Sequence, residues 1–178
     1  MRVHLVYCHP SETSFTAAVR DRALVGLHAA GHDVRVSDRY ADGFVPEPDI
    51  AEYAANLRWC EALVLVYPTW WAGQPAMLKG WIDRVWVAGV AYELPEGANR
   101  IRPRLHNIRR IVAITTHGST KFVNALEGEG GKRIVTRSLR VLCSKRARTT
   151  WIALYNIDRS TDARRAAHLA RVEQAMCE

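Results

Sequence analysis

The sequence predicts an α/β protein with a five-stranded parallel sheet. Short apolar runs alternate along the chain with longer segments whose apolar residues recur at helical spacing. The run at 62–67, ALVLVY, is continuously apolar, which is typical of a strand buried on both faces. Because a segment of helical length follows each run, the connections favour parallel strands joined by right-handed crossovers.

Length and composition indicate one globular domain, expected to span residues 1–178. A chain of 178 residues with 48% hydrophobic residues can bury a full core. No apolar stretch reaches the length of a membrane-spanning helix, and the N-terminal apolar run is too short for a signal peptide. We therefore expect a cytoplasmic protein without membrane insertion.

Four cysteines and a net charge of +7 limit the possible partners. Cys8, Cys60, Cys143 and Cys177 form no C-x-x-C pair, which favours thiols over disulfides or a metal site. The positive charge suits a solubilising surface, or the attraction of phosphorylated cofactors. Nucleic acid binding is not expected, because the arginines are spread over several segments without a recognition motif.

The first strand is expected at Val3–Tyr7, followed by the hydroxyl-rich turn at 9–14, HPSETS. Ser14 can cap a helix that ends before Gly31. The buried face of this helix would consist of Phe15, Val19, Ala23 and Leu27. The turn matches neither a P-loop nor G-x-G-x-x-G, yet the amides and dipole of a helix start make it a candidate anion site.

A second strand is expected at Asp33–Ser37 and leads into the proline-containing loop Asp38–Asp49. Asp49 can cap the helix that follows, whose apolar face would consist of Ile50, Tyr53, Ala54 and Leu57. The third strand, Ala62–Tyr67, is stopped by Pro68, since proline gives no amide to a sheet.

A loop with two adjacent tryptophans follows the third strand and precedes a helix that starts at Ala76. Loops at the carboxyl ends of parallel strands line the ligand crevice of such folds. Trp70 and Trp71 either pack into the core or a subunit interface, or form a wall against a flat ligand. The inward residues of the helix would be Met77, Trp81 and Val85, with Leu78, Ile82 and Trp86 beside them.

The second half of the chain continues the alternation. A loop is expected at 93–106, a strand at Arg110–Thr116, and a glycine-containing mobile loop at 119–132. A helix at Arg133–Cys143, with Val135, Leu139 and Leu142 inward, precedes the last strand, Thr150–Tyr155. Thr161 can cap a final helix, whose inward residues would be Ala166, Leu169, Val172 and Met176.

Three motifs carry a resemblance to a known family. The stretch at 67–81, YPTWWAGQPAMLKGW, resembles the signature of the flavodoxin-like NAD(P)H:quinone oxidoreductases, which include DT-diaphorase, bacterial quinone reductases and potassium-efflux ancillary proteins. His9 with Ser14–Thr16 resembles the family's first loop, and Thr115–Gly118 resembles its Thr-Thr-Gly-Gly motif. The resemblance runs from His4 to about Arg164, and implies a three-layer α/β/α sandwich with sheet order 2-1-3-4-5.

This resemblance implies a flavin, FMN or FAD, and NAD(P)H as hydride donor for the two-electron reduction of quinones or similar acceptors. The first loop would hold the flavin phosphate, and the other two motifs the ring. Arg164 matches an arginine near the adenosine of FAD-binding members. The implied cofactor-binding residues are His9, Ser14, Phe15, Thr16, Pro68, Thr69, Trp70, Trp71, Ala72, Thr115, Thr116, His117, Gly118 and Arg164.

Tyr92 and His117 are the candidate catalytic residues. Tyr92 resembles a family tyrosine near the nicotinamide and quinone pocket, although an ordinary surface or interface tyrosine would give the same sequence. His117 replaces the first family glycine, and either turns outward or places an imidazole near the reduced flavin. The tyrosine and histidine that handle protons in DT-diaphorase align with Asn124 and Gly130, so the proton donor stays open.

Two other functions stay open. A flavin-binding regulatory subunit of a potassium efflux system would contact a membrane partner, and a flavodoxin-type electron carrier would exchange single electrons. Such carriers are typically acidic, whereas this chain is basic. The family is usually dimeric with its site at the subunit interface, so we expect a homodimer. The choices between FMN and FAD, and between NADH and NADPH, are left open by the sequence, as is the acceptor.

Overall fold

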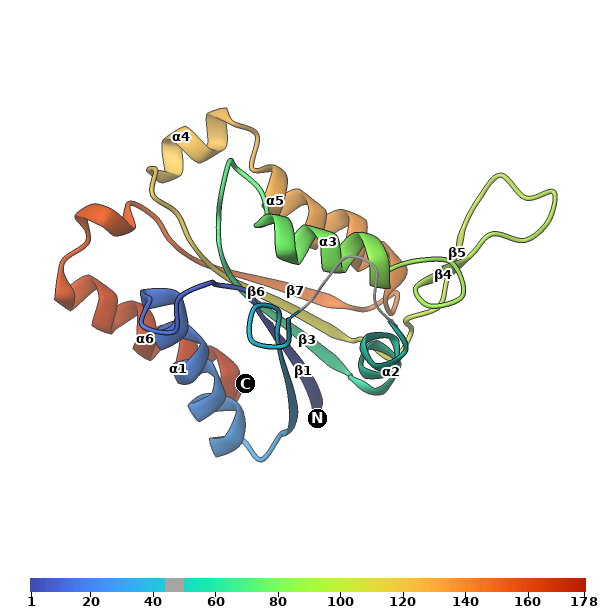
Figure 1. Ribbon diagram of the computed structural model, residues 1–178, viewed down its shortest axis with the longest axis horizontal. Helices are drawn as coiled ribbons and strands as arrows, with labels where there is room; N and C mark the ends of the chain where they lie inside the picture. Colours follow the sequence, from blue (N-terminus) through green and yellow to red (C-terminus); the bar gives the residue numbers. More distant parts are fainter. Residues whose placement is uncertain (44–49) are drawn as a thin grey trace.

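The computed structural model describes residues 1–43 and 50–178, and its centre is a five-stranded parallel sheet (Figure 1). The strands are β1 (Arg2–Tyr7), β2 (Asp33–Asp38), β3 (Ala62–Pro68), β6 (Arg110–Thr116) and β7 (Arg148–Leu154). They lie in the order β2-β1-β3-β6-β7, and every neighbouring pair is parallel. The predicted five-stranded parallel sheet is confirmed. Two short strands that the sequence did not predict form a separate sheet and carry the labels β4 and β5.

Helices cover both faces of this sheet (Figure 1). One face carries α1 (Phe15–Ala29) and α6 (Asp162–Cys177); the other carries α2 (Ala51–Trp59), α3 (Ala76–Val85) and α5 (Gly130–Arg133). Side chains of β3 alternate between the two cores, since Val64 and Val66 join the cluster with α1, whereas Leu63 and Leu65 join the cluster with α3. A strand buried on both faces is what the run at 62–67 predicts.

The helices of the first face begin at hydroxyl caps. The Ser14 side chain accepts from the Ala17 amide at the start of α1, and the Thr161 side chain accepts from the Arg164 amide at the start of α6. Gly31 follows α1 with a φ of 68°, as expected of a helix-ending glycine. The predicted inward face of α6 needs one correction. Ala166 is exposed and His168 is buried, because α6 faces α1 through His168, Val172 and Met176.

The segment at 119–132, predicted as a loop, contains helix instead. Helix α4 (Lys121–Leu126) is capped by the Thr120 hydroxyl, which accepts from the Val123 amide at 3.3 Å. Helix α5 begins at Gly130 and continues as a π-helical turn, η1 (Ile134–Leu139), and a 3-10 turn, η2 (Arg140–Leu142). The hydroxyl cap outweighs the glycines, since Gly128 follows α4 and Gly130 and Gly131 form the first turn of α5.

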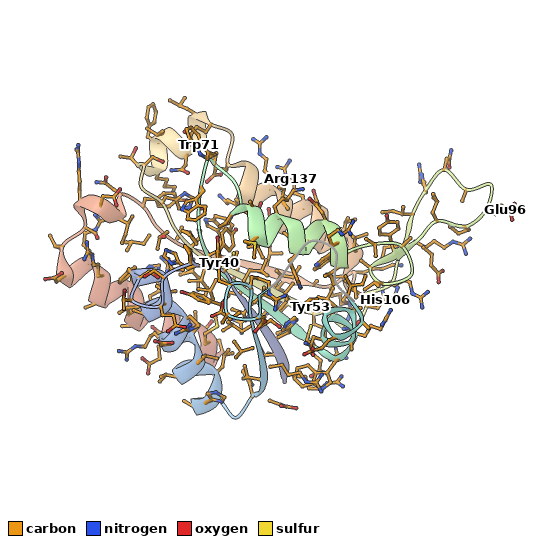
Figure 2. The ribbon with its side chains drawn as sticks, viewed as in Figure 1. Tyr40, Tyr53, Trp71, Glu96, His106 and Arg137 are labelled. Atoms are coloured by element: carbon orange, nitrogen blue, oxygen red, sulfur yellow. The ribbon has the colours of Figure 1, made fainter. Side chains whose placement is uncertain are left out.

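The region at 93–106, also predicted as a loop, carries the two extra strands. β4 (Tyr92–Glu93) and β5 (Arg102–Pro103) pair in antiparallel fashion and form the base of an arm that projects from the molecule (Figure 1). Glu96 lies at the tip of this arm (Figure 2). The predicted cap Asp49 lies outside the described residues. Ile50 occupies the cap position of α2 without a side-chain hydrogen bond.

The cysteines remain thiols. Cys8, Cys60 and Cys143 are buried and Cys177 is exposed, with no disulfide among them. Burial raises the pKa of each of the three buried thiols to about 12, so they stay protonated and unreactive near neutral pH. Among the described residues, no helix is both long and apolar enough to cross a membrane.

Candidate functional site

Loops from four strand ends enclose a cavity of about 400 Å³ at the carboxyl-terminal edge of the sheet. We call it the sheet-edge cavity. Nine of the residues predicted to bind a cofactor line it, namely His9, Ser14, Phe15, Thr16, Pro68, Thr69, Trp70, Thr116 and Gly118. The parallel arrangement brings them together, because β1, β3 and β6 are adjacent and end on the same side.

His9 lines this cavity, and the loop after β1 fixes which ring nitrogen carries the proton. Its Nδ1 accepts from the Ser11 amide at 2.9 Å, which places the proton of the neutral ring on Nε2. In this tautomer Nε2 is the donor nitrogen of the ring. The loop therefore orients His9 as a hydrogen-bond donor for an anion.

The start of α1 forms the second wall. The Ser14 hydroxyl accepts from the Ala17 amide at 3.1 Å, so the cap is made inside the helix. The amides of Phe15 and Thr16 belong to the first turn of the helix, where no preceding carbonyl is available to them. These amides and the helix dipole favour a negative group beside the buried hydroxyl of Thr16.

The tryptophan loop closes as a tight two-residue turn. The amide of Trp70 donates to the Gly73 oxygen at 3.1 Å, and the Gly73 amide donates back to Trp70 at 3.0 Å. The central residues, Trp71 and Ala72, have φ values of 50° and 57°, which makes this a type I′ turn. Left-handed backbone at two non-glycine residues in succession is strained, and such strain concentrates at functional sites.

The two tryptophans lie differently. Trp70 lines the sheet-edge cavity and is 42% exposed, whereas the Trp71 side chain is fully exposed at 102%. Figure 2 shows Trp71 at the outer end of the turn, away from the sheet. Core packing is therefore wrong for Trp71, whereas a place in a subunit interface stays a prediction. Within this chain, Trp70 is the tryptophan placed to contact a ligand.

Gly131 holds the turn in place. Its amide donates to the Ala72 oxygen at 2.9 Å, and its own oxygen accepts from Gln74 Nε2 at 2.9 Å. A Cβ at position 131 would lie 3.3 Å from the Cα of Gly73, so the close approach of the two backbones favours glycine. The junction of α4 and α5 thus sets the position of the tryptophan turn.

Some residues at the end of β6 and in the loop after it line the sheet-edge cavity, whereas others are buried in the protein. Thr116 and Gly118 line the sheet-edge cavity, but His117 is buried behind it and stacks on Tyr155, with ring centroids 4.5 Å apart. Thr115 is also buried, and its hydroxyl lies 2.8 Å from that of Thr69. His117 therefore meets the cavity only through Thr69, whose hydroxyl oxygen is 3.4 Å from His117 Nε2.

The hydrogen bonds of Asn124 fix the tautomer of His117. The Asn124 amide nitrogen donates to the Ser119 hydroxyl and the Thr120 carbonyl, so its oxygen faces His117 Nδ1 at 2.7 Å and accepts from it. Burial lowers the pKa of His117, and this outweighs the opposing effects of Asn124 and Glu129. A neutral His117 then has its Nε2 lone pair directed at the Thr69 hydroxyl.

Tyr92 and Arg164 do not line the sheet-edge cavity. Tyr92 is half-buried in β4, at the base of the projecting arm, and β4 lies far along the molecule from α4 (Figure 1). Arg164 is exposed in the first turn of α6, where its guanidinium donates to the Tyr155 carbonyl at 3.3 Å. Arg164 is nonetheless on the same edge of the sheet, because α6 follows the end of β7.

Two lining residues were not predicted. Ile157 and Asp158 belong to a 3-10 turn, η3 (Ile157–Arg159), directly after β7. Their position after a predicted strand was the available signal, since strand ends line such crevices. A Cβ at Gly118 would lie 3.2 Å from Asp158 Oδ2, which favours glycine there. No group of three His, Cys, Asp or Glu side chains within residues 1–43 and 50–178 is arranged to hold a metal ion.

Comparisons with known proteins agree with this geometry. The flavodoxin-like fold family matches residues 1–176. An NAD(P)H:quinone oxidoreductase structure from Methanothermobacter marburgensis is 27% identical, covering 99% of this chain and 96% of that one, with a TM-score of 0.82. NAD(P)H dehydrogenase [quinone] 1 of Cavia porcellus is 26% identical over 75% of this chain.

An uncharacterised NAD(P)H oxidoreductase of Escherichia coli, YcaK, is 34% identical over 51% of this chain. The matched regions span 60% of the Cavia porcellus protein and 55% of the Escherichia coli protein. The chain thus matches a little over half the length of these two curated relatives.

Proposed function

The chain belongs to the flavodoxin-like fold family, and from this we propose that it is a flavin-dependent NAD(P)H oxidoreductase that reduces quinones or similar acceptors by two electrons. The sheet-edge cavity is the observation that carries the proposal. It joins a donor-rich helix start to an aromatic turn at adjacent strand ends. The names of the quinone-reducing relatives support the choice of acceptor.

The lining residues fit a flavin. The volume of about 400 Å³ is in the range of small-molecule sites. His9 Nε2–H and the first amides of α1 form an anion-binding end, which suits a phosphate. Thr69, Trp70 and Thr116 supply two hydroxyls and an aromatic face at the other side, which suits a planar ring with polar edges. A carboxylate, Asp158, also lines the cavity and would disfavour a phosphate close to it.

A bound flavin would supply the redox chemistry, taking a hydride from NAD(P)H and passing two electrons to the acceptor. The protein's part is to bind and to orient. The α1 end holds the phosphate, and the strained turn sets the position of Trp70. Trp71, Ala72 and Thr115, which do not line the cavity, are proposed to act through the turn and through the hydroxyl of Thr69.

His117 is proposed to work indirectly. Its neutral ring can accept the hydroxyl proton of Thr69, which would leave the lone pairs of the Thr69 oxygen facing the cavity. Direct contact of His117 with the flavin, as the family resemblance suggests, remains a prediction. A His117→Gly variant that kept flavin affinity and turnover unchanged would contradict both ideas.

Tyr92 is proposed to serve the site of a second copy in a homodimer. Within one chain the base of the arm lies away from the sheet-edge cavity, so a role in catalysis requires a partner (Figure 1). The exposed apolar side chains of Trp71, Phe122, Val123 and Leu126 support association. Light scattering of the purified protein tests the dimer, and a Tyr92→Ala dimer with unchanged turnover would remove Tyr92 from the site.

We also propose that the flavin is FAD rather than FMN, because Arg164 matches an arginine of FAD-binding family members. The proposed location is the cytoplasm. If the protein retained a potassium efflux channel in a pulldown and showed no NAD(P)H turnover, it would instead be a regulatory subunit. An electron carrier would instead stop after one electron during reductive titration.

The test is flavin binding to the purified protein, followed by anaerobic addition of NADPH or NADH while the absorption spectrum is recorded. We expect FMN or FAD to bind and to bleach in one two-electron step. His9→Ala should weaken FMN about tenfold or more, because a hydrogen bond to a charged group is lost. Riboflavin, which lacks the phosphate, should bind His9→Ala and the wild type alike.

His106→Ala is the matched control, because His106 is exposed near the arm and away from the cavity (Figure 2). It should leave both affinities unchanged. Failure of both FMN and FAD to bind at saturating concentration would overturn the proposed function. Equal losses for FMN and riboflavin in His9→Ala would keep the flavin but remove His9 from the phosphate.

A further inference from the structure

A second cavity lies at the opposite, amino-terminal edge of the sheet. Its volume is about 590 Å³, larger than the sheet-edge cavity. The lining side chains that matter here are Arg109, Arg110, Arg146, Arg148, Thr150 and Glu178. We call it the arginine cleft. Both chain ends are on this side of the molecule (Figure 1).

Strand register places two of these arginines at paired positions on neighbouring strands. Arg110 at the start of β6 pairs with Arg148 at the start of β7, and neighbouring strands are about 4.8 Å apart. Paired residues of parallel strands point to the same face. Like charges directly opposite each other disfavour the pairing. Arg109 directly precedes Arg110 and Arg146 lies two residues before Arg148, whose amide donates to the Arg109 carbonyl at 2.9 Å.

The cleft holds more positive charge than nearby acids balance. Across residues 1–43 and 50–178, no ion pair within 4.0 Å involves Arg109, Arg146 or Arg148, and the Arg110 guanidinium donates to a neutral carbonyl, that of Ala175, at 2.8 Å. Glu178 is the one acidic side chain among the described lining residues. Glu61, close to Arg109, already accepts from the Arg2 amide at 3.1 Å.

A neighbouring histidine responds to this field. The pKa of His32 is lowered by burial first, then by the terminal ammonium group and by Arg110. The cations of this edge therefore act on groups beside them. These arginines repel one another and lack carboxylate partners, which lowers the stability of the fold. Such a cost is typical of a binding site, where an anionic ligand supplies the missing counter-ion.

We propose that the arginine cleft binds a small anion with two or more phosphoryl groups, such as the oligophosphate part of a nucleotide. Guanidinium groups donate two parallel hydrogen bonds to phosphate oxygens, and several of them can share one oligophosphate. Thr150 adds a hydroxyl. None of the described lining residues is aromatic, so charge rather than base stacking would provide recognition. The concave shape favours a small anion over a nucleic acid.

The test is calorimetric titration of inorganic triphosphate into the FMN-saturated protein at low ionic strength, without divalent cations. Saturation with FMN blocks the sheet-edge cavity as a competing phosphate site. Arg146→Gln/Arg148→Gln should bind triphosphate about tenfold or more weakly, because two charged hydrogen-bond donors are removed. Arg146→Lys/Arg148→Lys should fall in between, since it keeps the charge but loses the fork.

The control is Arg100→Gln/Arg137→Gln, which removes the same charge from two exposed arginines elsewhere; Arg137 is labelled in Figure 2. It should bind triphosphate within about twofold of the wild type, since distant surface charges are screened. Equal losses in both glutamine doubles, or no binding by the wild type, would overturn the proposal. Circular dichroism confirms that each variant is folded.

The last measurement titrates a single-stranded oligonucleotide in place of triphosphate. If it bound more tightly than triphosphate and depended on the same arginines, the small-anion assignment would be wrong and a nucleic acid would take its place. The cleft does not depend on the proposed flavin chemistry. If neither flavin bound, the titration would be repeated on the protein alone, and the three arginine double variants would still decide between the outcomes.

Discussion

The carboxyl-terminal and amino-terminal edges of the main sheet offer donors to anions by different chemistry. At the first edge the donors are the hydroxyls of Thr69 and Thr116, helix-start amides and the ring N–H of His9. At the second edge they are guanidinium groups, two of them on opposed strand positions. Neutral donors fixed by loops can select a ligand's shape, whereas full charges act at longer range with less selection.

The comparison also shows where the chain accepts strain. The first edge stores it in the left-handed backbone of Trp71 and Ala72, and the second in the like-charge pair of Arg110 and Arg148. Between them the sheet interior is almost entirely apolar. The local cost at both ends of the strands therefore lies where bound ligands can compensate for it.

The largest expected effect disturbs both edges at once. Helices α1 and α6 run between them and touch at Gly26, where a Cβ would lie 2.4 Å from the Glu173 carbonyl oxygen. Gly26→Val should lower the free energy of unfolding by about 3 kcal/mol, because the backbone of α6 must shift. Urea unfolding measures this. Val25→Ala, at an exposed site on the same helix, should stay within about 0.5 kcal/mol of the wild type.

The second prediction concerns how the free energy of unfolding depends on pH through a histidine at the carboxyl-terminal edge. His168 is 5% exposed and its ring lies 6.2 Å from that of Phe15, at the carboxyl-terminal edge. Burial, and then Arg171, lower the pKa of His168 from 6.5 to about 4. Below pH 6.5 the unfolded chain binds a proton that the folded chain does not, so stability falls with falling pH until about pH 4. The loss between pH 6.5 and 5 is about 2 kcal/mol.

His168→Gln removes this contribution, so the variant should lose about 2 kcal/mol less than the wild type over that range in urea unfolding. Comparing the pH slopes rules out the packing cost of the substitution itself. His28→Gln, at an exposed site on α1, should keep the wild-type slope. If His168→Gln also kept that slope, the ring would be able to charge in the folded state.

The smallest predicted effect is a gain. Ala72 has a φ of 57°, and glycine adopts this backbone without the Cβ penalty. Ala72→Gly should raise the free energy of unfolding by about 0.5–1 kcal/mol, since relief of strain exceeds the added freedom of the unfolded chain. Ala166→Gly, at an exposed site within α6, should instead lose about 1 kcal/mol. A loss at both positions would mean that the turn at Ala72 is not strained.

Much of the fold follows from local sequence signals. The run at 62–67 and the hydroxyl caps Ser14 and Thr161 predicted β3, α1 and α6, because burial on both faces and helix starts leave local patterns. The glycines at 128–131 masked α4, whose cap is a single hydroxyl at Thr120. The inward direction of His117 depends on Asn124 and Tyr155, which are distant from one another in sequence.

The two cavities also differ in how far the sequence alone predicts them. The sheet-edge cavity was predictable because strand ends and motifs identify its loops, and nine predicted residues line it. The arginine cleft was not predicted, because Arg110 and Arg148 become neighbours only through the register of β6 and β7. In the sequence they are scattered basic residues. Tertiary register carries information that no local pattern contains.

The left-handed turn also gives the protein an optical reporter. Of six tryptophans, Trp71 is the one whose indole is fully exposed, whereas Trp81 and Trp86 are buried. Emission from Trp71 should therefore be red-shifted and accessible to a dissolved quencher such as iodide, while the buried indoles emit to the blue. Because Trp71 is next to the lining residue Trp70, a chromophore in the cavity would absorb its emission by energy transfer. The turn can thus be monitored by fluorescence without a label.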